Sequence, residues 1–393
     1  MNSPAPAAAH LPVLLFGAPV GLYTGKIRSY FRKQGIAYLE RLPSDPVFQK
    51  ELLPQLKRFI NPVIRTAAGT VVQDTADIID FCEAAGLARA PATPATPVQR
   101  IVALTLDLFG GEGLVRPAMH YRWSFRAQNE NFLRHEFGLS YRPSRQPPEV
   151  VEKRLGDFMN YLAAYIPKFG ITQDTIPAIE ASYEAFLAAL DAHLRQHPYL
   201  LGGVPTLCDY GFMAPLYAHL ARDPVPCEIM KRIAPSVFRW TERMNANDAD
   251  VPEFPRYPAA LAADDSVPDT LLPVLRFIAS DWLPELEADI AAIDQWLASR
   301  GDSALEGKPI ERTLCETNFE LRGTRLTTIV QPYTLYKLQR VTDAWDALNA
   351  AERERERAGA VLAKAGLEKL PALKGARRVE RRDFLEVWGR ATS

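Results

Sequence analysis

The stretch from Asn61 to Phe81, NPVIRTAAGTVVQDTADIIDF, constrains the fold of this chain more than any other. A short β-branched run follows a proline, and the turn at 67–70 leads into a partner strand that begins at Val71. Two such runs around a turn that contains glycine predict a tight β-hairpin. Polar residues at 73–75 then precede apolar residues at helical spacing, so a capped helix is expected directly after the hairpin.

A helix that begins at this point can bind an anion. The backbone N–H groups of a first helical turn have no partners within the helix, and the helix dipole favours negative charge beside them. Asp74 and Thr75 add polar side chains to these groups. The same arrangement is typical of an ordinary junction between a hairpin and a helix, and the residues alone leave both interpretations open.

The elements around this hairpin form an α/β unit. The apolar run that ends at Gly17 is typical of a strand buried on both faces, and Gly35 is suited to terminate the helix that follows. The expected order is therefore β-α-β-α-β-β-α. The strands are expected at 11–17, 37–42, 63–66 and from 71, and the helices at 24–34, 46–59 and from 75.

Two further regions flank this unit. Residues 1–10 are expected to be a disordered tail. Residues 90–97, APATPATP, form a linker that indicates a domain boundary, and helical periodicity dominates beyond it. Thr206 and Asp209 form a capping box, which stabilises a helix start by about 0.5–2 kcal/mol and has a structural role.

The last part of the chain, residues 265–393, is predicted to be an additional, mostly helical α+β module. Helical spacing over 270–298 predicts one long helix. The alternating segment 317–333 contains Arg322 followed by glycine, which indicates a second hairpin. Two more helices follow, and a mixed-charge segment at 377–388 completes the chain.

The first two regions resemble the glutathione S-transferase superfamily, which joins a thioredoxin-like N-terminal domain to an all-α C-terminal domain. Asn61-Pro62, Gly69 and the pair Asp74-Thr75 stand where the family has its proline before a strand, its glycine turn and its acid–Ser pair. The Thr206 box follows in the right order. The resemblance covers about residues 11–244. It implies a thioredoxin-like domain at 11–88 and an all-α domain at 98–250, before the added module.

The resemblance also implies glutathione as a co-substrate. In the family, the proline is cis, the backbone before it pairs with the cysteinyl part, and the acid–Ser pair holds the γ-glutamyl carboxylate and amine. The residues implied here are Asn61, Pro62, Val63, Asp74 and Thr75. Thr75 can donate to a carboxylate, and Asp74 can accept from an ammonium. The implied activity is conjugation to, or cleavage of, a hydrophobic electrophile, as in detoxification.

A transferase of this kind must stabilise the thiolate of glutathione with a hydroxyl or thiol at the start of the first helix. Aligning residues 26–28 with the family pattern puts Gly21 at this position, where no such group exists. Tyr23 and Thr24 are the remaining hydroxyls. Tyr23 is preferred because a phenol is the better donor, although packing at a domain interface is an alternative, and Thr24 can equally be the helix N-cap.

A second candidate feature is the segment 119–126, MHYRWSFR. In the family, the corresponding helix faces the cleft, so His120, Tyr121, Arg122 and Trp123 are predicted to form the wall of a hydrophobic substrate pocket. Arg122 or Arg126 can hold an acidic group of a substrate or cofactor, and His120 can act as an acid or base. The alternative is that this aromatic stripe belongs to the core.

Composition narrows the classes of partner. A net charge of −1 gives no reason to expect nucleic acid or an anionic membrane surface. No apolar run approaches the ~20 residues that cross a bilayer. The four cysteines are widely separated and lack metal-site spacing, which indicates reduced thiols in a cytoplasmic protein and no metal site. The resemblance also allows a homodimer, because many relatives dimerise.

Two rival hypotheses remain at this stage. One is a non-catalytic member that uses the fold as a ligand-binding or interaction scaffold, which Gly21 and the added module favour. The other is a glutathione-dependent isomerase or reductase. The absence of a cysteine near Gly21 argues against the disulfide exchange that a reductase would need.

Overall fold

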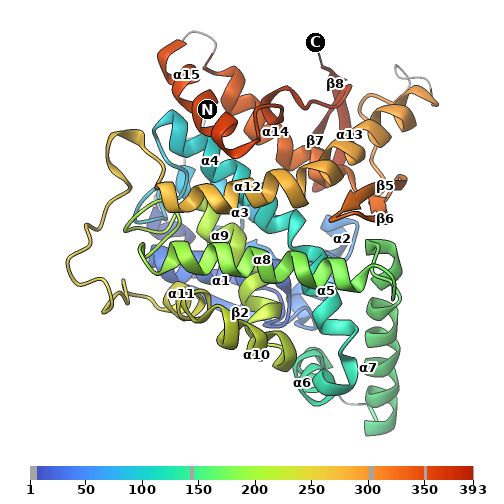
Figure 1. The fold of residues 1–393 in the computed structure, drawn as a ribbon. Coiled ribbons are helices and arrows are strands. Elements are labelled where there is room, and N and C mark those ends of the chain that lie inside the picture. The colour runs from blue at the N-terminus through green and yellow to red at the C-terminus, as the bar shows by residue number, and fades with distance from the viewer. Residues whose placement is uncertain (1–6, 142–145, 301–304, 349–351, 393) are drawn as a thin grey trace.

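The computed structural model describes residues 7–141, 146–300, 305–348 and 352–392. Figure 1 shows three groups of elements that follow one another along the chain: a small sheet with its helices, a helical domain, and the C-terminal module, which begins near residue 265. One continuous apolar core connects them, from Val13 in the sheet through Phe212 in the helical domain to Trp388 in the module.

The sheet has four strands in the order β2-β1-β3-β4. β1 pairs with β2 in parallel and with β3 antiparallel, and β4 is antiparallel to β3. A parallel pair requires a crossover helix, whereas the antiparallel pair needs only the predicted turn at Gly69. The thioredoxin-like fold class is therefore confirmed. The elements are β1 (Val13–Phe16), α1 (Leu22–Gln34), β2 (Tyr38–Arg41), η2 (Phe48–Leu52), α2 (Leu53–Leu56), β3 (Val63–Arg65), β4 (Val71–Gln73) and α3 (Thr75–Ala84).

The regular elements of the second group are all helices over its described residues, as expected. Its α9 is buried against α1 and α4, and Asp209 accepts the Thr206 N–H at 2.9 Å at the start of this helix. The predicted capping box is thus present and structural. The elements are α4 (Pro97–Leu108), η3 (Phe109–Gly113), α5 (Val115–Trp123), α6 (Arg126–Gly138), η4 (Leu139–Tyr141), α7 (Pro148–Ala163), η5 (Ile166–Phe169), α8 (Ile176–Leu194), α9 (Leu207–Pro215), η6 (Leu216–Leu220), α10 (Pro224–Ile233) and α11 (Pro235–Asn245).

The C-terminal module combines helices with two hairpins. It lies along the helical domain, and its α12 runs beside α8 (Figure 1). The predicted hairpin around Arg322 is present as β5 and β6. The elements are η7 (Ala263–Asp265), η8 (Asp269–Leu271), α12 (Leu272–Asp281), α13 (Leu283–Ala298), β5 (Cys315–Leu321), β6 (Thr324–Val330), α14 (Pro332–Asp346), α15 (Glu352–Ala365), η10 (Leu370–Ala372), β7 (Arg377–Arg382) and β8 (Leu385–Ala391).

The single long helix expected over 270–298 is wrong. The structure has two helices, α12 and α13, which meet at Trp282. Pro284 occupies the first turn of α13, and proline has no N–H to donate to the carbonyl of Ser280 one turn earlier. The helical periodicity therefore continues across a break that the proline imposes.

The structure also adds to what was expected at the two ends of the chain. The mixed-charge segment at 377–388 belongs to a β-hairpin, β7–β8, whose turn residues Asp383 and Phe384 both have positive φ. Within the expected disordered tail at 1–10, Ala7–His10 form a short 3-10 helix. His10 is buried, and its ring contacts Phe81. Its backbone carbonyl accepts the Ala67 N–H. Residues 1–6 lie outside the described residues.

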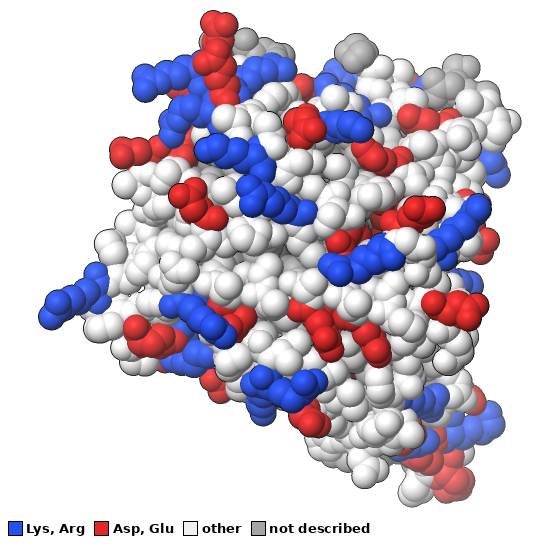
Figure 2. All heavy atoms as spheres, viewed as in Figure 1, with Lys and Arg blue, Asp and Glu red and all other residues white. Residues whose placement is uncertain are grey.

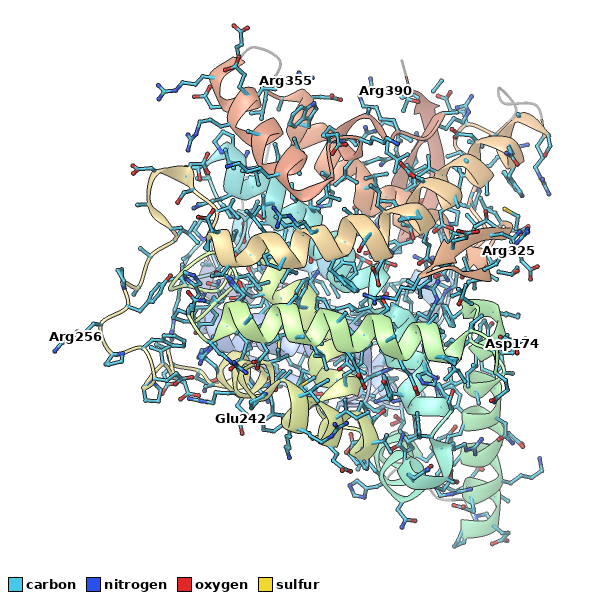
Figure 3. All side chains as sticks on the ribbon, viewed as in Figure 1. Asp174, Glu242, Arg256, Arg325, Arg355 and Arg390 are labelled. Atoms are coloured by element: carbon cyan, nitrogen blue, oxygen red, sulfur yellow. The ribbon has the colours of Figure 1, made fainter. Side chains whose placement is uncertain are left out.

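Charged side chains are exposed on the surface of these groups of elements. Figure 2 shows basic and acidic residues interspersed over the visible face. Asp174, Glu242 and Arg256, labelled in Figure 3, are exposed at the edges of the helical domain and on the loop that follows α11. Among the described helices, none combines the length and the apolar character that crossing a bilayer requires.

A buried carboxylate joins the three groups of elements. Asp107 of α4 accepts a hydrogen bond from Lys26 of α1, at 2.6 Å, and another from Lys337 of α14. All three side chains are at most 3% exposed. Two buried ammonium groups therefore share one carboxylate as their counter-charge, and removing it would leave both uncompensated.

We expect Asp107→Asn to lower the free energy of unfolding by about 3–5 kcal/mol, the usual cost of breaking a buried ion pair. Urea denaturation measures this change. Asp157→Asn is the matched control, because Asp157 pairs with Lys153 on the surface, where both side chains are more than half exposed. The control should change stability by less than about 1 kcal/mol. Equal effects of the two substitutions would contradict the role given to Asp107.

Candidate functional site

A cavity of about 370 Å³ lies between the sheet domain and the C-terminal module. Five of the predicted positions line it on the side of the sheet domain: Tyr23, Asn61, Pro62, Asp74 and Thr75. Its volume is within the roughly 300–1,000 Å³ that small-molecule sites occupy. The structure thus brings most of the predicted glutathione-site residues together around one space.

The opposite wall comes from the C-terminal module. Tyr333 at the start of α14, Leu385 and Glu386 of β8, and Ile310 and Arg312 of the preceding loop all line the cavity. This wall therefore combines apolar and charged groups. No residue of this wall was predicted from the sequence.

The loop that precedes β3 forms the floor of the cavity. The peptide bond between Asn61 and Pro62 is cis, as the resemblance implies. Val63 is fully buried in β3, where it pairs with Phe16 and Gln73. Asn61 and Pro62 are therefore part of the cavity wall, whereas the Val63 side chain lies beneath it.

Asp74 is the N-cap of α3 and has a φ of 85°, a conformation that residues other than glycine rarely adopt. Its Oδ1 accepts the Ala76 N–H at 2.9 Å and the Tyr333 hydroxyl at 3.0 Å. Its Oδ2 lies 3.1 Å from the Arg381 guanidinium. The carboxylate that the resemblance assigns to a ligand ammonium is therefore already paired with a cation of the C-terminal module.

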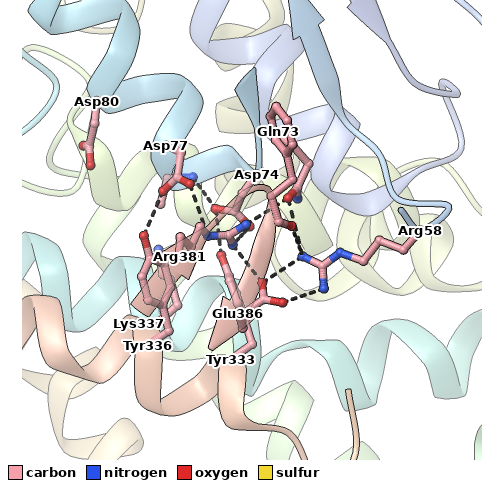
Figure 4. A network of polar contacts seen from close by, with 12 residues as sticks. Arg58, Gln73, Asp74, Asp77, Asp80, Tyr333, Tyr336, Lys337, Arg381 and Glu386 are labelled. Carbon is pink, nitrogen blue, oxygen red and sulfur yellow. Dashed lines mark hydrogen bonds and ion pairs between the residues drawn. The ribbon is translucent and has the colours of Figure 1, made fainter. Parts of the chain in front are cut away.

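The contact between Asp74 and Tyr333 is one of several polar contacts between α3 and α14 (Figure 4). Asp77 is the next acidic residue along α3, and it accepts a 2.8 Å hydrogen bond from Tyr336 of α14. Asp80 follows after another turn, and Arg340 of α14 pairs with it at 2.7 and 2.9 Å. Residues spaced by three or four positions share a helix face. The acidic face of α3 is therefore covered by donors on one face of α14.

The β7–β8 hairpin contributes a pair of opposite charges to the same region. Arg381 and Glu386 are directly opposite in the hairpin and lie 3.1 Å apart. Arg381 also lies 3.1 Å from Asp77, and Glu386 accepts from Arg58 of the sheet domain at 3.0 Å. Figure 4 shows this network, in which the module supplies a cation to Asp74 and an anion to Arg58.

The predicted catalytic hydroxyls have different environments. The Tyr23 hydroxyl donates to the Gly111 carbonyl at 3.2 Å beside the cavity, and burial, with the nearby Glu112, raises its pKa. Thr24 is fully buried and is not part of the cavity wall. The interpretation of Thr24 as the N-cap of this helix is wrong, because α1 begins at Leu22 and its N-cap is Gly21.

The four residues of the predicted substrate pocket, His120, Tyr121, Arg122 and Trp123, are all buried, and none of them lines this cavity. Arg122 is satisfied by Asp223 and by two backbone carbonyls. His120 is held between Ser124 and Glu180, and burial lowers its pKa. The aromatic rings of the other two residues pack in the core. Their burial and packing favour the alternative interpretation, in which the aromatic stripe belongs to the core.

Glu112 is a cavity residue that the sequence did not single out. It lies in η3, a π-helical turn between α4 and α5, and such turns are frequent at functional sites. Its carboxylate makes no hydrogen bond or ion pair with the described residues. Burial raises the pKa of Glu112 to about 7, and the nearby Lys337 acts in the opposite direction.

Some residues of the cavity wall have the polar groups that glutathione would need, and others do not. Thr75 lines the cavity, and its hydroxyl makes no hydrogen bond within the described chain, so it can donate to a carboxylate beside the α3 N-terminus. Arg312 is a cation at the rim. Asp74, by contrast, is engaged by Tyr333 and Arg381. No cluster of three or more potential metal-ligating side chains occurs within the described ranges.

Comparisons with known proteins give similar solved structures at low identity. The beta-etherase LigF from Sphingobium sp. strain SYK-6 is 15% identical, with a TM-score of 0.43, over 61% of this chain and 97% of its own. A glutathione transferase from Phanerochaete chrysosporium is 14% identical, with a TM-score of 0.41, over 61% and 98%. A Pseudomonas fluorescens family member with bound glutathione is 16% identical, with a TM-score of 0.34, over 61% and 96%. No protein-family model and no curated protein matches the sequence.

The architecture itself identifies the fold. A β2-β1-β3-β4 sheet, with a cis proline before β3, is followed by an all-helical domain whose buried helix α9 begins at a Thr-x-x-Asp box. The C-terminal module then covers the start of α3. The chain has the fold of the glutathione S-transferase superfamily, to which it adds a C-terminal module.

Proposed function

We propose that the cavity binds glutathione and that the protein uses the bound thiol in a transferase reaction on a hydrophobic electrophile. The observation that carries this proposal is the convergence of Tyr23, Asn61, Pro62 and Thr75 on one cavity of suitable volume. These residues come from α1, the loop before β3 and the start of α3. The transferase resemblance assigns them to the thiol, the cysteinyl backbone and the γ-glutamyl carboxylate.

Each residue has a distinct role in this proposal. Thr75 and the N–H groups of the first turn of α3 donate to the γ-glutamyl carboxylate. Tyr23 turns its hydroxyl from the Gly111 carbonyl to the sulfur, because a hydrogen bond to the thiolate lowers the thiol pKa. Apolar lining residues such as Ile310 and Leu385 hold the electrophile against the sulfur. This positioning contributes part of the rate enhancement over the uncatalysed reaction.

A second candidate function is a non-catalytic ligand-binding or interaction protein. Two observations favour it: Gly21 offers no side chain to a thiol, and Asp74 is engaged by Tyr333 and Arg381 of the C-terminal module. Under this alternative the cavity still binds a ligand, but the thiol of that ligand is not activated. A homodimer and a cytoplasmic location stay predictions from the sequence under both proposals.

Titration calorimetry with millimolar glutathione tests the binding site. We expect binding to the wild-type protein and roughly tenfold weaker binding to Thr75→Ala, because a hydrogen bond to a charged group contributes about 1.5–3 kcal/mol. Thr70→Ala is the matched control, since Thr70 is an exposed residue in the turn of the same hairpin. If the wild-type protein shows no heat of binding, the proposal is wrong.

The ultraviolet absorbance of a bound thiolate separates the two candidate functions. We expect a thiolate signal near neutral pH, and we expect Tyr23→Phe to raise the pKa of the bound thiol by about 1, which corresponds to the loss of roughly 1.4 kcal/mol. Tyr38→Phe serves as the control, because Tyr38 lies in β2 away from the cavity. Binding without any thiolate signal would favour the non-catalytic function, and a signal that Tyr23→Phe leaves unchanged would exclude Tyr23.

A further inference from the structure

Asp74 is already bonded within the protein. A glutathione-like ligand therefore lacks the carboxylate that was expected to bind its ammonium group. The Asp74 carboxylate accepts from the Ala76 N–H and the Tyr333 hydroxyl and faces the Arg381 guanidinium. A carboxylate has only about four acceptor sites, and its charge is already balanced. A ligand with a positive charge must therefore either displace Arg381 or find another carboxylate in the cavity.

Glu112 is the carboxylate that meets this need. Glu386 also lines the cavity, but it is paired with Arg58 and Arg381. Glu311 is exposed to solvent on the loop before β5. Within the described residues, Glu112 is therefore the interior carboxylate of the cavity wall that has neither a cation nor a hydrogen-bond donor.

The charged groups around Glu112 explain why it remains unpaired. Lys337 of α14 and Lys26 of α1 attract it, but both ammonium groups are bonded to Asp107 of α4. Asp107 and Asp74 repel it. Burial in this setting favours a carboxyl group that holds a proton, unless a cation enters the cavity.

We propose that Glu112 receives the ammonium group of a glutathione-type ligand and thereby makes the cavity selective for peptides with a free amino group. The ligand then lies with its carboxylate at Thr75, its cysteinyl part at the loop before Pro62 and its ammonium towards the π-helical turn η3. This inference rests on the proposed binding of glutathione. It concerns ligand recognition and holds whether or not the thiol is activated.

Binding selectivity provides the first test. S-methylglutathione and its N-acetylated derivative are titrated into the full-length protein by calorimetry, so the ligands differ only at the amino group and carry no thiol proton. We expect wild-type protein to bind the free amine at least tenfold more tightly, and we expect Glu112→Gln to reduce this ratio by roughly tenfold. Glu311→Gln should change the ratio by less than about twofold, because solvent screens an exposed charge.

Proton release on binding provides the second test. Glu112 with a pKa of about 7 is roughly half protonated at pH 7. An ammonium stabilises the ionised carboxylate and lowers its pKa, so binding releases up to about half a proton, and affinity rises as the pH increases from about 6 to 8. Titrations of S-methylglutathione in buffers with different ionisation enthalpies count this proton, and Glu112→Gln should abolish the release.

The outcomes separate this inference from the proposed function. If S-methylglutathione binds without proton release, or if Glu112→Gln retains the full preference for the free amine, Glu112 is not the ammonium partner although the site stands. If S-methylglutathione does not bind to the wild-type protein at millimolar concentration, the proposed function fails and the inference fails with it. Glu112→Asp, which keeps the charge, should retain proton release and provides a variant if the Gln protein does not fold.

Discussion

The ion pairs of Asp107 determine the geometry of the cavity. Lys26 lies three residues after Tyr23 on α1, and Lys337 lies four residues after Tyr333 on α14. These spacings place each lysine one helical turn from a cavity residue. Asp107 itself is five residues before Glu112. One buried carboxylate therefore fixes the three segments that carry Tyr23, Tyr333 and Glu112, and the apolar core around it holds them at a constant separation.

The C-terminal module changes the electrostatics of the first domain as well as its exposure. A helix start with Asp74, Asp77 and Asp80 on one face would otherwise present three carboxylates to solvent. α14 and β7–β8 supply donors to each of them, including Arg381, which bridges Asp74 and Asp77. An arginine suits this position because its planar guanidinium can contact two carboxylates at once. The module thus neutralises the acidic surface beside the cavity, while Thr75 and Glu112 still line the cavity.

The sequence predicts the first domain well because its signals are local. The proline, the glycine turn and the Asp74 cap lie within a single stretch, and their order determines the hairpin and the helix. The second wall of the cavity depends on contacts such as that between Asp74 and Tyr333, which are 259 residues apart, and no local pattern encodes their partnership. The β7–β8 hairpin is similarly hidden, because its strands are rich in Arg and Glu and its turn lacks glycine.

In the aromatic segment around Arg122, by contrast, the sequence suggests a binding site where the structure has buried and bonded side chains. Its composition suggests a pocket, but the polar atoms of Arg122 and His120 are all used by neighbours. From sequence alone, a satisfied buried arginine and a ligand-binding arginine look the same. Burial and hydrogen-bond partners distinguish them, and both depend on the position of Asp223 a hundred residues later in the chain.

The start of α1 explains why the chemistry of this cavity depends on more than one domain. A Cβ on Gly17 would lie 2.4 Å from the Thr24 hydroxyl, and one on Gly21 would lie 3.0 Å from it. Thr24 therefore fills the space in which a side chain at either glycine would stand. Tyr23 lies close to this point, and its hydroxyl donates to Gly111 in the π-helical turn that also carries Glu112. This part of the cavity wall thus comes from the junction of α1 with the helical domain, and its geometry depends on how the two domains pack.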